Sequence, residues 1–144
     1  MTRNTPRYLL DTNIVLFIVR AHALVAELEA RFALFTGRNR HLISYVTLAE
    51  IRVLGQVGGW GENRWATLER VLKSCEVAPI YGQYTLENYI TVDTFSRFQG
   101  RDMGSKNDIW IAATAISYEA TLLTTDKDFD HLTQIGVDVE RLAI

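Results

Sequence analysis

The 144-residue sequence contains one cysteine, Cys75, and no apolar run long enough to cross a membrane. A single cysteine cannot form an internal disulfide or a cysteine-rich metal cage, and it fits a reducing compartment. The longest apolar stretch is interrupted by Arg20 and His22, well short of the roughly 20 residues that a spanning helix needs. We therefore expect a cytoplasmic protein without a membrane segment, in which Cys75 is a buried structural thiol.

An excess of charge is also missing, because 15 Lys and Arg residues face 17 Asp and Glu residues for a net charge of −2. Such a chain is no general binder of polyanions, so any attraction to nucleic acid must be local and partly supplied by bound cations. The hydrophobic fraction of 48% is that of an ordinary globular protein. The length predicts a single domain over residues 1–144.

Histidine is scarce as well. His22, His41 and His131 are far apart, and none is paired with a second ligand at the helical spacing of a zinc site. A zinc centre is therefore not indicated. We expect each histidine to lie at the surface or at the boundary of the core.

Strand-like and helical patterns alternate along the chain. The strand-like runs lie near residues 7–11, 41–46, 76–81, 120–125 and 137–142. Helical periods fill the gaps, including a helix over about 84–99 whose apolar positions are Leu86, Ile90 and Phe98. This alternation predicts an α/β fold with a parallel sheet and helices on both faces.

Four acidic residues occupy the ends of these predicted elements. Asp11, Glu50 and Asp126 each come soon after a predicted strand, and Asp108 opens an apolar helix. Sites in open parallel sheets form beyond the carboxyl ends of the strands. We therefore expect the first three acids at one edge of the sheet, whereas the pattern leaves the position of Asp108 relative to that edge open.

Each acid taken alone has an ordinary explanation as a helix cap. Residues 47–50 read as a capping box and residues 105–108 as a near relative of one. Thr125 or Asp126 could cap the helix that follows them, because side-chain oxygens bond the free N–H groups of a first turn.

Taken together, the acids favour a metal site. Asp11 follows an apolar strand and has no Lys or Arg within three residues downstream, yet a buried unpaired charge is costly. Three or four carboxylates within about 5 Å would repel by about 3 kcal/mol per pair at an effective dielectric constant of 20. Mg²⁺ or Mn²⁺ is the counter-cation that suits oxygen ligands of this kind.

The motifs around the acids resemble those of a known family. Residues 9–13 (LLDTN), 47–51 (TLAEI), 107–115 (NDIWIAATA) and 123–129 (LTTDKDF) are similar, in order and spacing, to the motifs of PIN-domain ribonucleases. More narrowly, they resemble the VapC-type toxins of bacterial and archaeal toxin–antitoxin pairs. The resemblance runs from about residue 7 to the C-terminus.

The resemblance implies a three-layer α/β/α sandwich with a central, mostly parallel sheet. It implies a metal-dependent endoribonuclease with one or two Mg²⁺ or Mn²⁺ ions in its active site. It also implies a homodimer, and a small antitoxin whose C-terminal segment occupies the active-site groove.

Carried over residue by residue, the resemblance assigns a quartet of catalytic and metal-binding acids: Asp11, Glu50, Asp108 and Asp126. It matches or allows supporting residues beside them: Thr12, Asn13, Thr125 and Asp128. Basic residues near the acids are candidates for contacts with RNA phosphates: Arg101, Lys106 and Lys127.

The chemistry that these residues suggest is metal-assisted hydrolysis of a phosphodiester bond. We expect Asp11 and Asp108 to be direct metal ligands. Glu50 and Asp126 would bind the ion directly or through water, or act as a base that orients the attacking water.

Two other functions stay open on the sequence alone. A haloacid-dehalogenase-like phosphatase also has an Asp at the end of its first strand, but it needs a second Asp where this chain has Asn13. A non-catalytic binding module with a PIN-like fold is the other alternative. Such a module would have little reason to keep four acids that repel one another.

Overall fold

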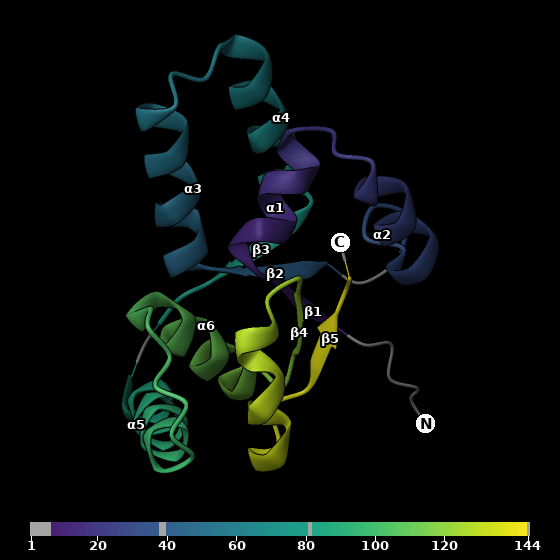
Figure 1. Ribbon diagram of the computed structural model, residues 1–144. Coiled ribbons are helices and arrows are strands. Elements are labelled where there is room, and N and C mark those ends of the chain that lie inside the picture. Colours follow the sequence, from purple (N-terminus) through teal and green to yellow (C-terminus); the bar gives the residue numbers. More distant parts are fainter. Residues whose placement is uncertain (1–6, 38–39, 81, 144) are drawn as a thin grey trace.

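The computed structural model describes residues 7–37, 40–80 and 82–143 (Figure 1). The elements follow one another as β1 (Tyr8–Leu10), α1 (Thr12–Val19), α2 (Leu24–Phe32), β2 (His41–Ser44), α3 (Tyr45–Val57), α4 (Glu62–Lys73), β3 (Cys75–Ala78), α5 (Gly82–Phe98), α6 (Lys106–Ser117), β4 (Thr121–Thr124), the 3-10 helix η1 (Lys127–Ile135) and β5 (Val139–Arg141). A strand is found within or beside each of the five runs that the sequence predicts. The predicted alternation of strands and helices is therefore confirmed.

The strands form one sheet in the order β3-β2-β1-β4-β5. Every pairing between neighbouring described strands is parallel, and Leu9 of β1 is in register with Leu42 of β2 and with Leu122 of β4. The chain adds β2 and then β3 on one side of β1, and later places β4 on the other side of β1. This reversal of strand order makes the carboxyl ends of β1 and β4 the place where a parallel sheet opens a crevice.

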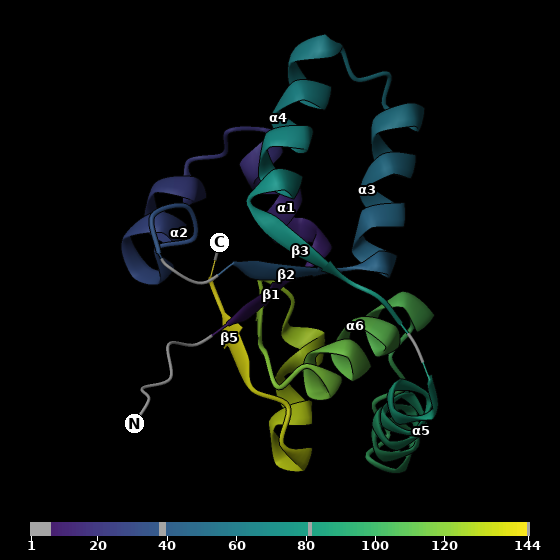
Figure 2. The ribbon, with the colours of Figure 1, turned by 180° about the vertical axis from the view of Figure 1, so that it is seen from behind.

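The central strands are apolar throughout because both faces of the sheet are covered. Leu10 and Leu123 point into a core formed with helices α1 to α4. Leu9 and Leu122, one position earlier, point into a second core formed with α5, α6 and η1. Figures 1 and 2 show the two helical layers on opposite sides of the sheet. The predicted three-layer α/β/α sandwich is therefore confirmed.

Helix α5 is where the sequence predicts, but its buried face is different. Leu86, Ile90 and Phe98 are 49, 54 and 85% exposed, whereas Val92 and Ser96 are fully buried. Apolar spacing correctly identified a helix but not the side that packs against α6 and η1. The inward side includes small and hydroxyl-bearing residues, and a buried hydroxyl is acceptable where it has a hydrogen-bond partner.

The single cysteine and the lack of long apolar runs led to two expectations, a buried thiol and no membrane segment. Cys75 begins β3 and is 6% exposed, and burial raises the pKa of its thiol. The expected buried thiol is confirmed. In the part of the chain that the structure describes, no helix combines the length and the apolar character needed to span a membrane.

Candidate active site

Asp11 lies immediately beyond β1 and caps the first turn of α1. Its Oδ1 accepts a hydrogen bond from the backbone N–H of Thr12 at 2.8 Å, and its Oδ2 accepts one from the hydroxyl of Thr124 at 2.7 Å. The residue is 4% exposed. Both carboxylate oxygens are therefore held in fixed positions at the carboxyl edge of the sheet.

The environment of Asp11 disfavours its charge. Burial raises the pKa of this carboxyl, the hydrogen bonds from Thr124 and Thr12 oppose the rise, and the charges of Asp126 and Glu50 add to it. A carboxylate accepting two hydrogen bonds would normally ionise easily. Here burial and the neighbouring acids outweigh those bonds.

Glu50 lies in the second turn of α3 and points to the same edge. The capping-box interpretation of this residue is wrong, because α3 is capped by Ser44, whose hydroxyl accepts from the N–H of Thr47 at 3.0 Å. The carboxylate of Glu50 instead accepts from the hydroxyl of Thr12 at 2.6 Å and from the side-chain amide of Asn107 at 3.1 Å. Glu50 is thus held between α1 and α6 rather than by its own helix.

Asp108 joins the other acids from the first turn of α6, which settles the position that the sequence left open. Ser105 caps this helix, as predicted, by accepting from the N–H of Asp108 at 3.4 Å. Burial raises the pKa of Asp108 to about 7, and further contributions come from the charges of Asp11, Asp126, Glu50 and Asp128. Four acids from three separate parts of the chain therefore act on this one carboxyl.

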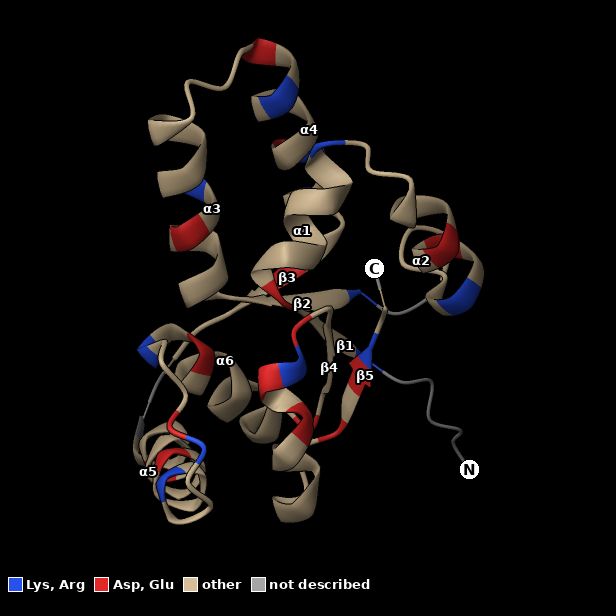
Figure 3. Cartoon of the chain, in the orientation of Figure 1, with Lys and Arg blue, Asp and Glu red and all other residues tan. Residues whose placement is uncertain are grey.

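Asp126 follows β4 and caps η1, with its Oδ1 accepting from the N–H of Asp128 at 2.9 Å. Its own N–H donates to the hydroxyl oxygen of Thr124 at 2.9 Å. The Thr124 hydroxyl, which also donates to Asp11, therefore connects the ends of β1 and β4. Figure 3 shows acidic segments on α3, at the start of α6 and where β4 leads into η1, around one edge of the sheet.

The hydroxyl that supports the acids is thus that of Thr124, whereas the sequence predicts Thr125. Thr124 is fully buried, and the Thr125 hydroxyl forms no hydrogen bond with a described residue. One signal in the sequence could have identified Thr124: a hydroxyl in the last position of an otherwise apolar buried strand needs a hydrogen-bond partner. Asn107, which holds Glu50, was also missed, although it directly precedes Asp108.

The remaining predicted residues lie at different distances from the acids. The Thr12 hydroxyl is within the site, and Asp128 is close enough to raise the pKa of Asp108. Asn13 is exposed on α1, and its side chain forms no hydrogen bond within the described ranges. Lys106 is the exposed first residue of α6.

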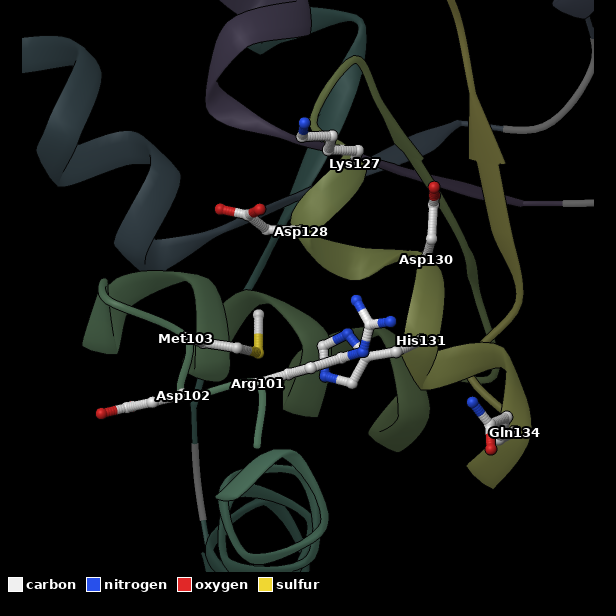
Figure 4. A pocket seen from close by; sticks show the side chains of 8 residues that line it. All are labelled: Arg101, Asp102, Met103, Lys127, Asp128, Asp130, His131 and Gln134. Atoms are coloured by element: carbon white, nitrogen blue, oxygen red, sulfur yellow. The ribbon is translucent and has the colours of Figure 1, made fainter. Parts of the chain in front are cut away.

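The two other basic candidates, Arg101 and Lys127, line a cavity of about 610 Å³ next to the acids (Figure 4). Among residues 7–37, 40–80 and 82–143, no Lys or Arg forms a salt bridge with any acid of the quartet. The negative charge of the site is therefore not balanced by the described side chains.

The expectation that all three histidines lie at the surface or core boundary is wrong for two of them. His41 and His131 are 3 and 8% exposed. The Nδ1 of His41 accepts from the N–H of Tyr8 at 3.2 Å, and the Nε2 of His131 is 2.8 Å from the hydroxyl of Ser96. Burial lowers the pKa of both rings, which favours their neutral forms.

The donor chemistry of the site fits a hard divalent cation. Carboxylate oxygens that raise one another's pKa are the ligands that such an ion would stabilise. No three described His, Cys, Asp or Glu side chains are grouped so that they could hold a metal ion between them. The acids are therefore arranged more openly than the sequence suggests. Mg²⁺ tolerates this openness, because it keeps several waters and is often bound by one or two carboxylates.

The family profile described as "PIN domain" matches residues 8–134. The chain belongs to the PIN-domain family. The match covers β1 to η1 and includes all four acids, so the PIN-domain assignment that the motifs suggested is confirmed.

Relatives within the PIN-domain family have similar lengths. The chain is 30% identical over 131 residues to ribonuclease VapC1 of Haemophilus influenzae strain R2866, covering 89% of this chain and 93% of that protein. Its fold is similar to that in the crystal structure of VapBC2 from Rickettsia felis bound to a promoter DNA fragment, with a TM-score of 0.73 and 25% identity over 93% of this chain and 97% of the other. It is also similar to that of VapBC-5 from Mycobacterium tuberculosis, a member of the VapBC family of toxin–antitoxin systems, with a TM-score of 0.66 and 29% identity over 96% of this chain and all of the other.

The raised pKa of Asp108 predicts that the metal-free PIN domain loses stability as pH rises. The folded state binds the Asp108 proton more tightly than the unfolded chain, whose pKa is near 3.8. The loss of folding stability therefore begins at about pH 4 and is complete above the folded-state pKa of about 7. In EDTA, Asp108→Asn should melt at a higher temperature than the wild type at pH 8, with a gap that narrows toward pH 5.

The matched control is Asp93→Asn, which removes a partly buried carboxylate, 18% exposed, that is paired with the exposed Arg97 at the surface. Such surface pairs contribute little, so this variant should follow the wild type at both pH values. Equal melting temperatures for Asp108→Asn and the wild type at pH 8 would show that the carboxylates do not repel one another at this site.

Proposed function

We propose that this chain is a metal-dependent endoribonuclease and the toxin component of a type II toxin–antitoxin pair. The observation that carries the proposal is the convergence of acids from four elements at Asp108, whose pKa is raised to about 7 by burial and, after it, by the charges of the other acids. Membership of the PIN-domain family and the similarity to ribonuclease VapC1 support it. The fold shared with VapBC2 and VapBC-5 supports the toxin–antitoxin context.

In this proposal Asp11 and Asp108 hold a Mg²⁺ or Mn²⁺ ion. When bound, the ion supplies charge stabilisation for the scissile phosphate and lowers the pKa of a water molecule. Asp11 suits the role because Thr12 and Thr124 fix both of its oxygens in advance. Asp108 suits it because its carboxyl is destabilised when ionised without a counter-charge.

Glu50 and Asp126, whose charges act on both members of this pair, orient the attacking water. The two bonds to Glu50, from Thr12 and Asn107, fix the direction of its carboxylate. Asp126 is fixed through its Oδ1 by the N–H of Asp128. Preorganised carboxylates lower the cost of arranging the reacting groups.

The alternative functions are less well supported by this geometry. A haloacid-dehalogenase-like phosphatase would need a carboxylate at position 13, where Asn13 faces solvent. A non-catalytic module would not need hydrogen bonds that position each repelling acid, as Thr124 does for Asp11.

An apolar groove beside Glu50 supports an antitoxin partner. It has a volume of about 590 Å³ and lies along α3, where it is lined mainly by apolar side chains together with Asn107. Val53 and Leu54 in its wall are 58 and 41% exposed. We expect a segment of the antitoxin to cover these side chains and block access to Glu50, since exposed apolar patches of this kind mark binding surfaces.

A homodimer acting in the cytoplasm completes the proposal. Val57 at the end of α3 and Phe98 at the end of α5 are 84 and 85% exposed, which a second copy of the chain would relieve. Sedimentation equilibrium should give twice the chain mass of 16.4 kDa, and a monomer at micromolar concentration would contradict this part of the proposal.

The nuclease proposal predicts that Asp11→Asn abolishes RNA cleavage in the presence of Mg²⁺ or Mn²⁺. The amide removes a ligand charge, keeps its oxygen for the N–H of Thr12 and can donate to the hydroxyl oxygen of Thr124, so the fold should persist. Loss of a central catalytic group should lower the rate by roughly a hundredfold or more. Cleavage of a fluorescent RNA, with circular dichroism as a check on folding, measures both. Asp93→Asn on α5 is the control and should cleave normally; an Asp11→Asn protein with wild-type activity would refute the proposed role.

The antitoxin proposal predicts that Val53→Asp weakens inhibition without weakening cleavage. A charge placed in the apolar groove leaves the partner with an unpaired charge at the contact, whereas Val53 is too exposed to matter much for folding. The partner to use is the small protein encoded next to this chain, and the measurement is its inhibition constant in the RNA assay. Leu86→Asp, on α5 in the other helical layer, serves as the control. Equal inhibition of all three proteins would exclude the groove as the docking site.

A further inference from the structure

The cavity next to the acids has the lining of a ligand site. It is about 610 Å³ in volume and is lined by Arg101, Asp102, Met103, Lys127, Asp128, Asp130, His131 and Gln134 (Figure 4). Ligand sites in proteins have volumes of roughly 300–1,000 Å³. Asp128 joins the cavity to the catalytic edge, since its N–H holds Asp126 and its charge acts on Asp108. A chain of nucleotides that crosses the acids would therefore continue into this cavity.

The cations of the cavity have no partners in the part of the chain that the structure describes. Neither Arg101 nor Lys127 forms a salt bridge there. One of the three acids of the lining, Asp130, accepts from Arg141 at 3.0 and 3.1 Å, whereas Asp102 and Asp128 form no salt bridge within the described residues. The guanidinium of Arg101 and the ammonium of Lys127 can therefore attract an anion beside the catalytic acids, in competition with these two carboxylates.

The floor of the cavity differs from its rim. Met103 and His131 are 3 and 8% exposed and present an apolar thioether and a largely neutral ring. The His131 ring is held by the Ser96 hydroxyl and by the backbone of Asp128, and it is stacked at an interplanar angle of 8° with Phe95. A flat, fixed surface of this kind suits a nucleobase.

Gln134 supplies the polar group that a base edge needs. Its side chain is exposed at the rim and forms no hydrogen bond with a described residue. An amide offers one acceptor and two donors, so it can bond the edge of a base. Asp130, which also lines the cavity, is already bound by Arg141, so Gln134 is the neutral amide of the lining that can select a base.

Both cations are set in place by the local backbone. Gly100 has a φ of 68°, and the N–H of Arg101 bonds the carbonyl of Ser96 at 2.8 Å. This arrangement ends α5 and fixes the path of Arg101. Lys127 is the first residue of η1, directly after the cap at Asp126. Lys127 therefore belongs to the element that Asp126 caps, and Arg101 lies in the connection between α5 and the helix that carries Asp108.

We infer that this cavity is a subsite for one nucleotide of single-stranded RNA next to the scissile phosphate. Arg101 and Lys127 attract phosphates of the RNA backbone, the base lies beside Met103 and His131, and Gln134 contacts the base edge. The inference rests on the proposed ribonuclease function and adds to it the residues that set base preference.

The first experiment compares cleavage of a randomised single-stranded RNA pool by the wild type, Gln134→Ala and Arg101→Gln, with sequencing of the products. The wild type should prefer one base at a fixed position beside the cut. Gln134→Ala should reduce that preference by about fivefold, the equivalent of one lost hydrogen bond, with little change at other positions. Arg101→Gln should raise KM several-fold with kcat nearly unchanged, because it loses a phosphate contact made in both ground and transition states.

Gln56→Ala and Arg64→Gln, exposed residues of the other helical layer, are the controls and should cut as the wild type does. If Gln134→Ala and Arg101→Gln keep wild-type preference and KM, the subsite is excluded. If the wild type cuts no RNA, the ribonuclease proposal fails, and the subsite is decided by binding alone.

The binding experiment needs no cleavage. Each of the four 5′-mononucleotides is titrated into the intact protein in EDTA, and the amide NMR signals of Arg101, His131 and Gln134 are followed. The subsite predicts shifts that saturate and that differ among the four bases, and that Arg101→Gln weakens. Shifts that inorganic phosphate reproduces in full, or no shifts at all, would overturn the inference.

Discussion

Repulsion among carboxylates is the constraint on which the rest of this structure depends. The fold brings Asp11, Glu50, Asp108 and Asp126 to one edge of a parallel sheet without a salt bridge from any described cation to any of them. The reversal of strand order between β1 and β4 makes this possible, because it opens the sheet at the point where two of the acids emerge. The cost is visible in the raised pKa of Asp108.

Hydrogen bonds keep the acids in place despite this repulsion. The Thr124 hydroxyl joins Asp11 to the backbone of Asp126, and the Thr12 hydroxyl joins α1 to Glu50. Asp11 and Asp126 also cap α1 and η1. The capping and catalytic interpretations of these residues are therefore compatible: each oxygen that bonds a free N–H also fixes the direction of its carboxylate. A site built in this way is ordered before any ligand arrives.

Much of the fold followed from local pattern. Continuous apolar runs identified the strands because both faces of the sheet are covered, and acids after those runs identified the edge where the site lies. The predictions that failed concern the direction in which a side chain points, or a partner that is far away in the sequence. A spacing of three or four residues locates a helix such as α5, but exposed Leu86 and Ile90 satisfy the same spacing as buried Val92.

The supporting residues of the site were harder to predict for the same reason. Thr124 and Thr125 are chemically identical neighbours, and only the alternation of side chains along β4 decides which one meets Asp11. Asn107 and Glu50 are 57 positions apart, so no local pattern relates them. The cap of α3 by Ser44 rather than Thr47 depends on where β2 ends, which sequence patterns define poorly.

The central claim is that these carboxylates form the binding site of a divalent cation. Its most direct test is the titration of the intact wild-type protein with Mn²⁺ at pH 8, with free Mn²⁺ followed by electron paramagnetic resonance. The account predicts saturable loss of the free-ion signal, with one or two ions bound per chain, and much weaker binding to Asp108→Asn. A free-ion signal that the wild-type protein leaves unchanged would contradict it.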